Sequence, residues 1–137
     1  GGAGRSWLHH SLSSLDQSLR ACGSRLILAL GPSEAALDRL IEATGACAIY
    51  WNRLYTPAAV MRDRGLKERY RGRGLNVTSC NGALLHEPWE VLTGAGEPYR
   101  VFTPYWRRAA ARLEPGRLPS APVRLTDPGI DGLPLEA

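Results

Sequence analysis

The sequence predicts an α/β fold in which parallel strands alternate with helices, and two observations support this class. Residues 25–30 and 47–51 form short, apolar runs, which are typical of strands covered on both faces. Between them, residues 33–44 place apolar side chains on one helical face, and Gly45 follows as a residue suited to end a helix. A strand, a helix and a strand in this order form a βαβ unit, which implies parallel strands joined by a right-handed crossover.

The chain begins with a predicted helix over residues 6–22. We expect the Ser6 hydroxyl to cap its start, Gly23 to supply a left-handed residue at its end, and Ser33 to cap the helix that follows. Apolar residues of the first helix recur at steps of four and three, which is typical of a face turned toward a core. This stripe consists of Leu8, Leu12, Leu15, Leu19 and Cys22.

A second unit of strand, helix and strand follows. The apolar run before Asn52 ends there, because the short amide of asparagine favours a turn. Thr56 and Pro57 are suited to the cap and the first position of a helix, which is predicted over 57–71. Residues 75–80 alternate between apolar and polar side chains, as an edge strand does. The sequence thus predicts a parallel sheet with about three recognisable strands.

The corner after Asn52 is the first place to look for a ligand. In open α/β sheets, small molecules bind where the carboxyl end of a strand meets the next helix. The alternative is an ordinary connection between a strand and a helix, which these residues alone also allow. The other corner of this kind, at 31–33, lacks the glycines of a dinucleotide or phosphate-binding fingerprint.

A long connection over residues 81–104 follows the third predicted strand. Loops of this length that carry their own apolar and aromatic side chains are usually functional or form an interface. A short basic helix is predicted over 105–113, and the five prolines of 114–137 indicate an extended linker. We therefore divide the chain into a partial α/β domain, 1–113, and a proline-rich interdomain linker, 114–137.

Length and composition indicate one globular domain, with 137 residues of which 44% are hydrophobic and 22% charged. The formal net charge of +4 permits weak attraction to nucleic acid without establishing it. The three cysteines form no CxxC pair, so we expect buried free thiols in a reducing compartment, the cytoplasm. The apolar runs are far shorter than the roughly 18 residues of a membrane-spanning helix, so no membrane partner is expected.

The sequence shows no catalytic constellation. It has no Ser-His-Asp arrangement with supporting motifs, and its three histidines lie at no metal-ligand spacing with the cysteines. Glu87 and Glu90 flank Trp89, and we interpret them as surface or loop-capping groups rather than as a catalytic carboxylate pair. No catalytic residue and no metal ligand is therefore predicted in this chain.

Four motifs resemble those of a known family. They are W-L-H-H-S-L at 7–12, W-N-R-x-Y-x-P at 51–57, N-G-A-L-L-x-E-P-W-E-V-L-T-G at 81–94 and Y-R-V-F-T-P-Y-W-R at 99–107. In this order and at this spacing they resemble the N-terminal α/β domain of DNA photolyases and cryptochromes, over about residues 6–125. The resemblance implies a Rossmann-like, doubly wound parallel sheet. It also implies that the first two strands of that domain are missing, so that the sheet is incomplete at its N-terminus.

The resemblance also implies a function for the full-length protein. Family members repair pyrimidine dimers in damaged DNA with light, using FAD held by a C-terminal helical domain that also binds the DNA. That domain is missing here, so we expect the chain alone to be inactive. The first expectation is the N-terminal domain of a deoxyribodipyrimidine photolyase. The alternatives are a cryptochrome-type blue-light signalling domain and a stand-alone nucleotide-binding module.

In this family the α/β domain often carries an antenna pigment, which the resemblance places at the corner after Asn52. Folate-binding members have an Asn-Glu pair where this chain has Ala58 and Ala59, so a folate is disfavoured because its pterin would lack polar partners. A flavin and the absence of any pigment both stay open. The candidate antenna-binding residues are Trp51, Asn52, Arg53, Tyr55, Ala58 and Ala59.

An incomplete sheet also bears on self-association. The family order would place two missing strands between 26–30 and 47–51, and open strand edges expose unpaired backbone groups beside apolar surface. We expect either direct pairing of 26–30 with 47–51 or self-association of the chain. The leucine stripe of the first helix, which such pairing would leave partly uncovered, favours self-association.

Overall fold

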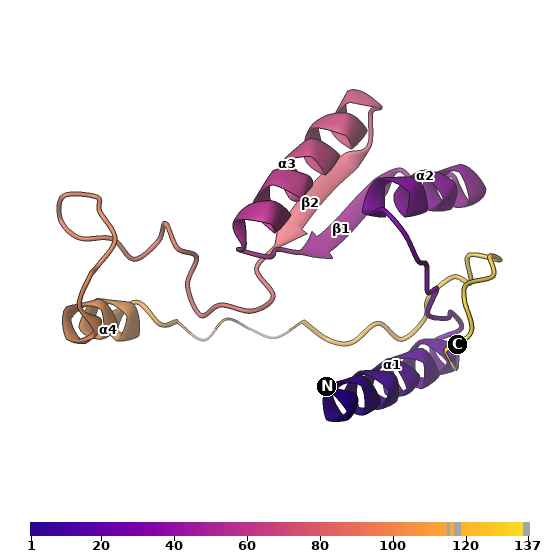
Figure 1. Cartoon of the computed structure of the whole chain (residues 1–137), viewed down its shortest axis with the longest axis horizontal. Coiled ribbons are helices and arrows are strands. Elements are labelled where there is room, and N and C mark those ends of the chain that lie inside the picture. The colour runs from indigo at the N-terminus through magenta and orange to yellow at the C-terminus, as the bar shows by residue number, and fades with distance from the viewer. Residues whose placement is uncertain (115, 117–118, 136–137) are drawn as a thin grey trace. The chain divides into compact units, whose positions relative to one another are not determined.

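The structure is a computed structural model that describes residues 1–114, 116 and 119–135 (Figure 1). Within these residues the chain forms two compact units. The first contains residues 1–47 and the described residues from 119 onward, and the second contains the described residues of 48–118. Each unit is described separately. The elements are α1 (Gly2–Ala21), α2 (Ser33–Thr44), β1 (Ala48–Asn52), α3 (Pro57–Gly72), β2 (Asn76–Cys80) and α4 (Phe102–Ala111).

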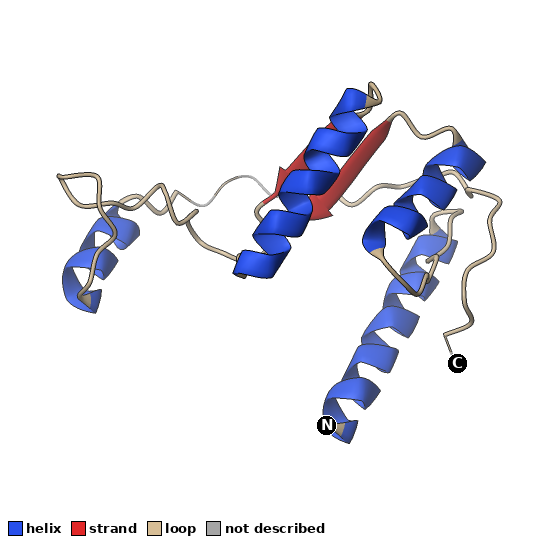
Figure 2. Ribbon diagram, turned by 45° about the horizontal axis from the view of Figure 1, so that its top comes forward, coloured by secondary structure: helices blue, strands red, loops and turns tan. Residues whose placement is uncertain are grey.

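The second unit is built on a parallel pair of strands with a helix between them in sequence. β1 pairs with β2 in parallel, with Ile49 opposite Val77 and Trp51 opposite Ser79. Helix α3 connects the two strands and packs against β2 (Figure 2). The prediction of parallel strands joined by a helix is confirmed for this pair. Since both strands run the same way, their carboxyl ends meet at one edge of the sheet.

The core of the second unit lies between α3 and the sheet. Tyr70 is fully buried, and Leu66 and Ala59 are buried on the same face of α3, one and three turns before it. Val77 is buried on β2 and completes this core. Asp63 belongs to the same helical face, because it lies four residues after Ala59 and three before Leu66. A carboxylate therefore stands within an otherwise apolar stripe.

The boundaries of α3 and α2 agree with the sequence predictions more closely than their caps do. Thr56 occupies the cap position of α3 and Pro57 the first turn, but the Thr56 side chain makes no capping hydrogen bond. Helix α2 ends at Gly45 in the left-handed conformation, with φ of 64°, as predicted. Its cap position is Pro32, so the prediction that Ser33 caps it is wrong.

The predicted strand at 25–30 is wrong, and so is its pairing with 47–51. In the described residues the sheet contains only β1 and β2. Residues 25–30 belong to no strand, and the amide of Leu133 in the C-terminal segment donates to the carbonyl of Leu28 at 2.8 Å. A strand requires a ladder of such bonds, and an apolar run without a neighbouring strand has none.

The first helix also departs from the prediction. α1 begins at Gly2 rather than at Ser6, and no side chain caps it. Every residue of α1 is described and none is buried, so the expectation that its leucine stripe faces a core is wrong. In the first unit, hydrogen bonds hold the chain after α1 to the end of this helix: Asp16 accepts from the amide of Leu26 at 2.8 Å. Gly23 has φ of 87°, as predicted.

The cysteines are free but are not buried as expected. Cys47 and Cys80 are exposed because they lie at or just beyond the ends of the short strands, whereas Cys22 is half-buried. The Cys22 thiol donates a hydrogen bond to the carbonyl of Pro122 at 3.3 Å. No helix of the described residues is long and apolar enough to span a membrane.

The close approach of the C-terminal segment to residues 27–28 leads to a stability prediction. A Cβ on Gly132 would lie 2.7 Å from the amide nitrogen of Leu28, so Gly132→Ala should push these backbones apart. We expect a loss of roughly 1–2 kcal/mol in the free energy of unfolding, within the range for an overpacked site. Urea denaturation would measure it. Gly116→Ala is the matched control, because a Cβ there meets nothing within 4 Å; equal losses in both variants would contradict the close approach.

Candidate functional site

The carboxyl ends of β1 and β2 form a polar corner in the second unit. The chain leaves β1 at Arg53, whose amide still donates to the carbonyl of Cys80 at 2.9 Å. This bond holds the start of the turn against the end of β2. Arg53 from the turn thereby comes close to Ser79, the penultimate residue of β2.

The Arg53 guanidinium is fixed by three contacts. Its Nε donates to the Ser79 hydroxyl at 3.1 Å, and its Nη2 donates to the Ser79 carbonyl oxygen at 2.5 Å. Its Nη1 donates to Oε1 of Glu87, which forms an ion pair with it. Ser79 is itself buried. The planar guanidinium is therefore held in one orientation by the strand end and presents its remaining edge to a carboxylate.

Glu87 is buried, with 7% of its surface exposed, so its interpretation as a surface group is wrong. Both of its carboxylate oxygens are occupied: Oε1 accepts from Arg53, and Oε2 accepts from the Tyr55 hydroxyl at 2.8 Å. Glu90 caps the loop as predicted, because its carboxylate accepts from the amide of Glu87 at 2.8 Å. A carboxylate can be buried here because two donors, the Arg53 cation and the neutral Tyr55 hydroxyl, replace its water.

An exposed aromatic ring adjoins this cluster. The central carbon of the Arg53 guanidinium lies 5.3 Å from the ring centroid of Trp89, within the range of a cation–π contact. Trp89 keeps 57% of its surface exposed. Arg53 thus contacts two residues of the segment after β2, Glu87 by an ion pair and Trp89 by a cation–π contact.

Trp51 belongs to a different cluster, on the side of α3. Its indole Nε1 donates to Oδ2 of Asp63 at 2.8 Å, and the Lys67 ammonium lies 5.9 Å from its ring centroid. The other oxygen of Asp63 accepts two bonds from the Arg62 guanidinium, at 2.6 and 3.0 Å. This pairing explains how the buried Asp63 fits into the apolar stripe of α3.

The other candidate residues stand outside the polar cluster. Asn52 is exposed at the end of β1, and its side chain lies so close to Gly82 that a Cβ there would approach it to 2.5 Å. Ala58 is exposed, whereas Ala59 is buried in the helix core. The structure therefore brings Arg53 and Tyr55 together and leaves the remaining four candidates apart from them.

Tyr55 has a raised pKa in this cluster. Burial raises the pKa of the Tyr55 phenol above its ordinary value of 10.0, and the hydrogen bond to the Glu87 carboxylate raises it further because tyrosinate would be repelled. The Arg53 guanidinium opposes this rise in pKa. The folded state therefore favours the neutral phenol more strongly than the unfolded state does.

This raised pKa predicts a loss of stability in alkali. The stability that the raised Tyr55 pKa contributes to the folded state is fully present below pH 10. It should be lost as the pH rises from 10 through the pKa of the folded state. Urea unfolding of the wild type and of Tyr55→Phe at pH 8 to 11.5 would measure it. The wild type should lose stability more steeply than the variant above pH 10. If the free energies of unfolding of the wild type and of Tyr55→Phe fell in parallel above pH 10, Tyr55 would not have the raised pKa.

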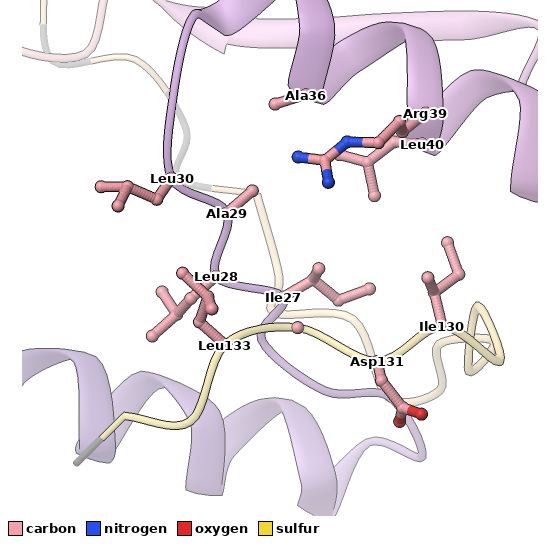
Figure 3. A pocket seen from close by; sticks show the side chains of 11 residues that line it. Ile27, Leu28, Ala29, Leu30, Ala36, Arg39, Leu40, Ile130, Asp131 and Leu133 are labelled. Atoms are coloured by element: carbon pink, nitrogen blue, oxygen red, sulfur yellow. The ribbon is translucent and has the colours of Figure 1, made fainter. Parts of the chain in front are cut away.

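A cavity lies within the first unit. Residues 27–30, the start of α2 and residues 130–133 surround a cavity of about 360 Å3 (Figure 3). Its lining is mainly aliphatic, with Arg39 and Asp131 as the charged side chains. None of the candidate antenna residues lines it. Among the described residues no group of three His, Cys, Asp or Glu side chains could hold a metal ion.

Sequence reasoning missed Glu87 and Ser79. A signal was present, because a parallel pair brings both strand ends to one edge, and Ser79 lies beside the end of β2. Pairing Arg53 with Glu87, 34 positions further along the chain, required the path of the loop between them. The motif W-N-R-x-Y-x-P at 51–57 and the motif at 81–94, which contains E-P-W, thus meet in space.

Comparisons with known proteins identify the family. The model of the DNA photolyase family matches residues 1–124. The chain is 46% identical over 130 residues to a deoxyribodipyrimidine photo-lyase of Agrobacterium fabrum, and this match covers 95% of the chain and 27% of that protein. It is 43% identical over 110 residues to cryptochrome-2 of Arabidopsis thaliana, which covers 79% of the chain and 18% of the relative.

A solved structure agrees with these sequence matches. The crystal structure of a bacterial class III photolyase from Agrobacterium tumefaciens superposes with a TM-score of 0.90 at 44% identity, covering 99% of this chain and 29% of that one. The chain therefore spans less than a third of the length of these relatives. From the match of the family model over residues 1–124, we conclude that this chain belongs to the DNA photolyase family.

Proposed function

We propose that this chain serves as the N-terminal α/β domain of a deoxyribodipyrimidine photolyase, which repairs pyrimidine dimers in DNA with light. The observation that carries the proposal is the 46% identity to the Agrobacterium fabrum photo-lyase over 130 residues. Because the chain covers 27% of that relative, FAD and damaged DNA are assigned to the remainder of the full-length protein. The part proposed for this chain is to form the α/β domain and to hold the segment after β2 in place.

We extend the proposal to the organisation of the chain. Residues 1–113 form the partial α/β domain, and 114–137 act as the linker to the helical domain that the family resemblance implies. The prolines of this stretch support an extended path. Within this stretch, residues 115, 117–118 and 136–137 lie outside the described part of the chain.

For the antenna, we propose that no folate binds at the corner after Asn52. Ala58 and Ala59 supply no polar side-chain atoms, and Arg53 and Tyr55 are already engaged with Glu87. A pterin placed there would leave its ring donors unpaired unless it displaced this carboxylate. Chromophore extraction and mass analysis of the full-length protein would test this, and stoichiometric folate lost on mutation of this corner would contradict it.

A chimaera tests the proposed function. The aligned 130 residues of this chain would replace their counterpart in the Agrobacterium fabrum photo-lyase, and repair of dimer-containing DNA would be measured in light and in darkness. We expect FAD retention and light-dependent repair by the chimaera, and no repair by the 137-residue chain alone. A chimaera that folds and retains FAD but does not repair DNA would contradict the proposal.

The second candidate is a cryptochrome-type signalling domain, which the 43% identity to Arabidopsis cryptochrome-2 favours. The chimaera distinguishes the photolyase function from the cryptochrome function. Retained FAD photoreduction without DNA repair would favour the cryptochrome alternative, whereas repair at a rate close to that of the parent enzyme would favour a photolyase.

A further inference from the structure

We propose that Arg53, which Ser79 holds in position, and Tyr55 form a carboxylate-binding site, which the chain fills with its own Glu87, so that the filled site fastens segment 81–101 to the end of the sheet. We call this contact the Glu87 latch. It does not depend on the proposed photolyase function, because it concerns only the second unit of this chain.

The donors of the site match a carboxylate. One oxygen of Glu87 accepts from the Arg53 guanidinium and the other from the Tyr55 hydroxyl, so the group is bound by a cation and by a neutral donor. Charge-assisted bonds of this kind are the stronger class of protein hydrogen bond. Any small monocarboxylate presents the same two oxygens and should bind the same donors.

The site does not need Glu87 to keep its shape. Arg53 retains two bonds to Ser79 that do not involve Glu87, one to the hydroxyl and one to the carbonyl oxygen. Ser79 is held in the ladder opposite Trp51, and the Arg53 amide is bonded to Cys80. Removal of the carboxylate therefore leaves the guanidinium positioned at a vacant, partly buried place.

The latch connects two parts of the second unit. Segment 81–101 contacts α4 through His86, whose Nε2 lies 2.8 Å from the Ala109 carbonyl oxygen. The Glu90 carbonyl also accepts from Arg112, the residue that follows α4, at 2.7 Å. The contacts of the segment with the sheet end include those of Glu87 and Trp89 with Arg53 and the close approach of Gly82 to the Asn52 side chain. Loss of the Glu87 contact should therefore loosen the part of the segment around residue 87 from the sheet end while its contacts with α4 persist.

Chemical rescue tests the site. Glu87→Ala in the 137-residue chain should lower the midpoint of thermal unfolding by about 10 °C, because a partly buried guanidinium loses its counterion. Sodium formate or acetate should restore roughly 3–5 °C of this loss beyond the effect of sodium chloride at equal concentration. The wild type, the double variant Arg53→Ala/Glu87→Ala and the control Glu97→Ala should show no such difference. Glu97 is an exposed glutamate of the same segment.

Two results would overturn the proposal. The first is a folded Glu87→Ala variant that responds to formate and acetate no more than to chloride. If that variant does not fold, Glu87→Gln keeps the volume of the side chain and removes its charge, and hydrogen exchange then reports the latch. We expect faster exchange over 81–101 than in Glu97→Gln, with β1 and β2 unchanged. Equal exchange of this segment in the two variants would overturn the latch.

Discussion

Replacement of Tyr70 by alanine should lower the free energy of unfolding of the second unit by about 3–5 kcal/mol, as loss of a buried aromatic ring does. Tyr70 is fully buried and lies on the same face of α3 as Leu66. The two short strands and α3 surround few other buried side chains, so the unit has little capacity to close the cavity. Urea denaturation followed by tryptophan fluorescence would measure the loss.

Two variants serve as controls for the Tyr70 prediction. Tyr50→Ala changes the same residue type on β1 at a position with 64% of its surface exposed, so we expect a loss below about 1 kcal/mol. Tyr70→Phe retains the ring and separates the effect of the hydroxyl from that of the cavity. A loss at Tyr70→Ala no larger than that at Tyr50→Ala would show that α3 does not pack on the sheet as described.

Replacement of Arg53 by alanine should have the second largest effect and lower the free energy of unfolding by about 2–4 kcal/mol. The variant leaves the Glu87 carboxylate, which is 7% exposed, without its cation. Removal of one partner of a buried ion pair costs about 3–5 kcal/mol, and the partial exposure of the Arg53 side chain reduces this value. The stability of Arg53→Lys should fall between that of the wild type and that of Arg53→Ala, because lysine keeps the charge but cannot form the three directed contacts.

Arg100→Ala is the matched control for the arginine prediction. Arg100 is exposed, and its replacement removes the same positive charge from the same unit. Urea denaturation would measure the free energies of unfolding of Arg53→Ala, Arg53→Lys and Arg100→Ala. Equal losses for Arg53→Ala and Arg100→Ala would mean that the positive charge itself, rather than the ion pair with Glu87, accounts for the effect.

The part of the fold that local sequence determines was predicted well. The boundaries of α3 follow from Thr56 and Pro57 at its start and from the glycine-rich turn at its end, which are features of neighbouring residues. The βαβ order of β1, α3 and β2 implied parallel strands, and the register confirms them. Sequence therefore located the corner at the end of β1, where Arg53 and Tyr55 lie.

The errors concern contacts between distant parts of the chain. Residues 25–30 are apolar, but a strand also needs a neighbouring strand, and the sequence of the run does not specify one. The leucine stripe of α1 has helical spacing, but that spacing cannot show whether anything covers it. Glu87 is interpreted from the sequence as a surface or loop-capping group because its two donors lie 34 and 32 residues earlier in the chain.

The claim on which the site depends most directly is that Arg53 and Glu87 contact each other at the ends of β1 and β2. A double-mutant cycle measures this contact, using Arg53→Ala, Glu87→Ala and the double variant in urea denaturation. We expect a coupling free energy of about 1.5–3 kcal/mol, because each single variant leaves the other group unpaired and the double variant removes both. Losses that add to within about 0.5 kcal/mol would contradict the contact and the site built on it.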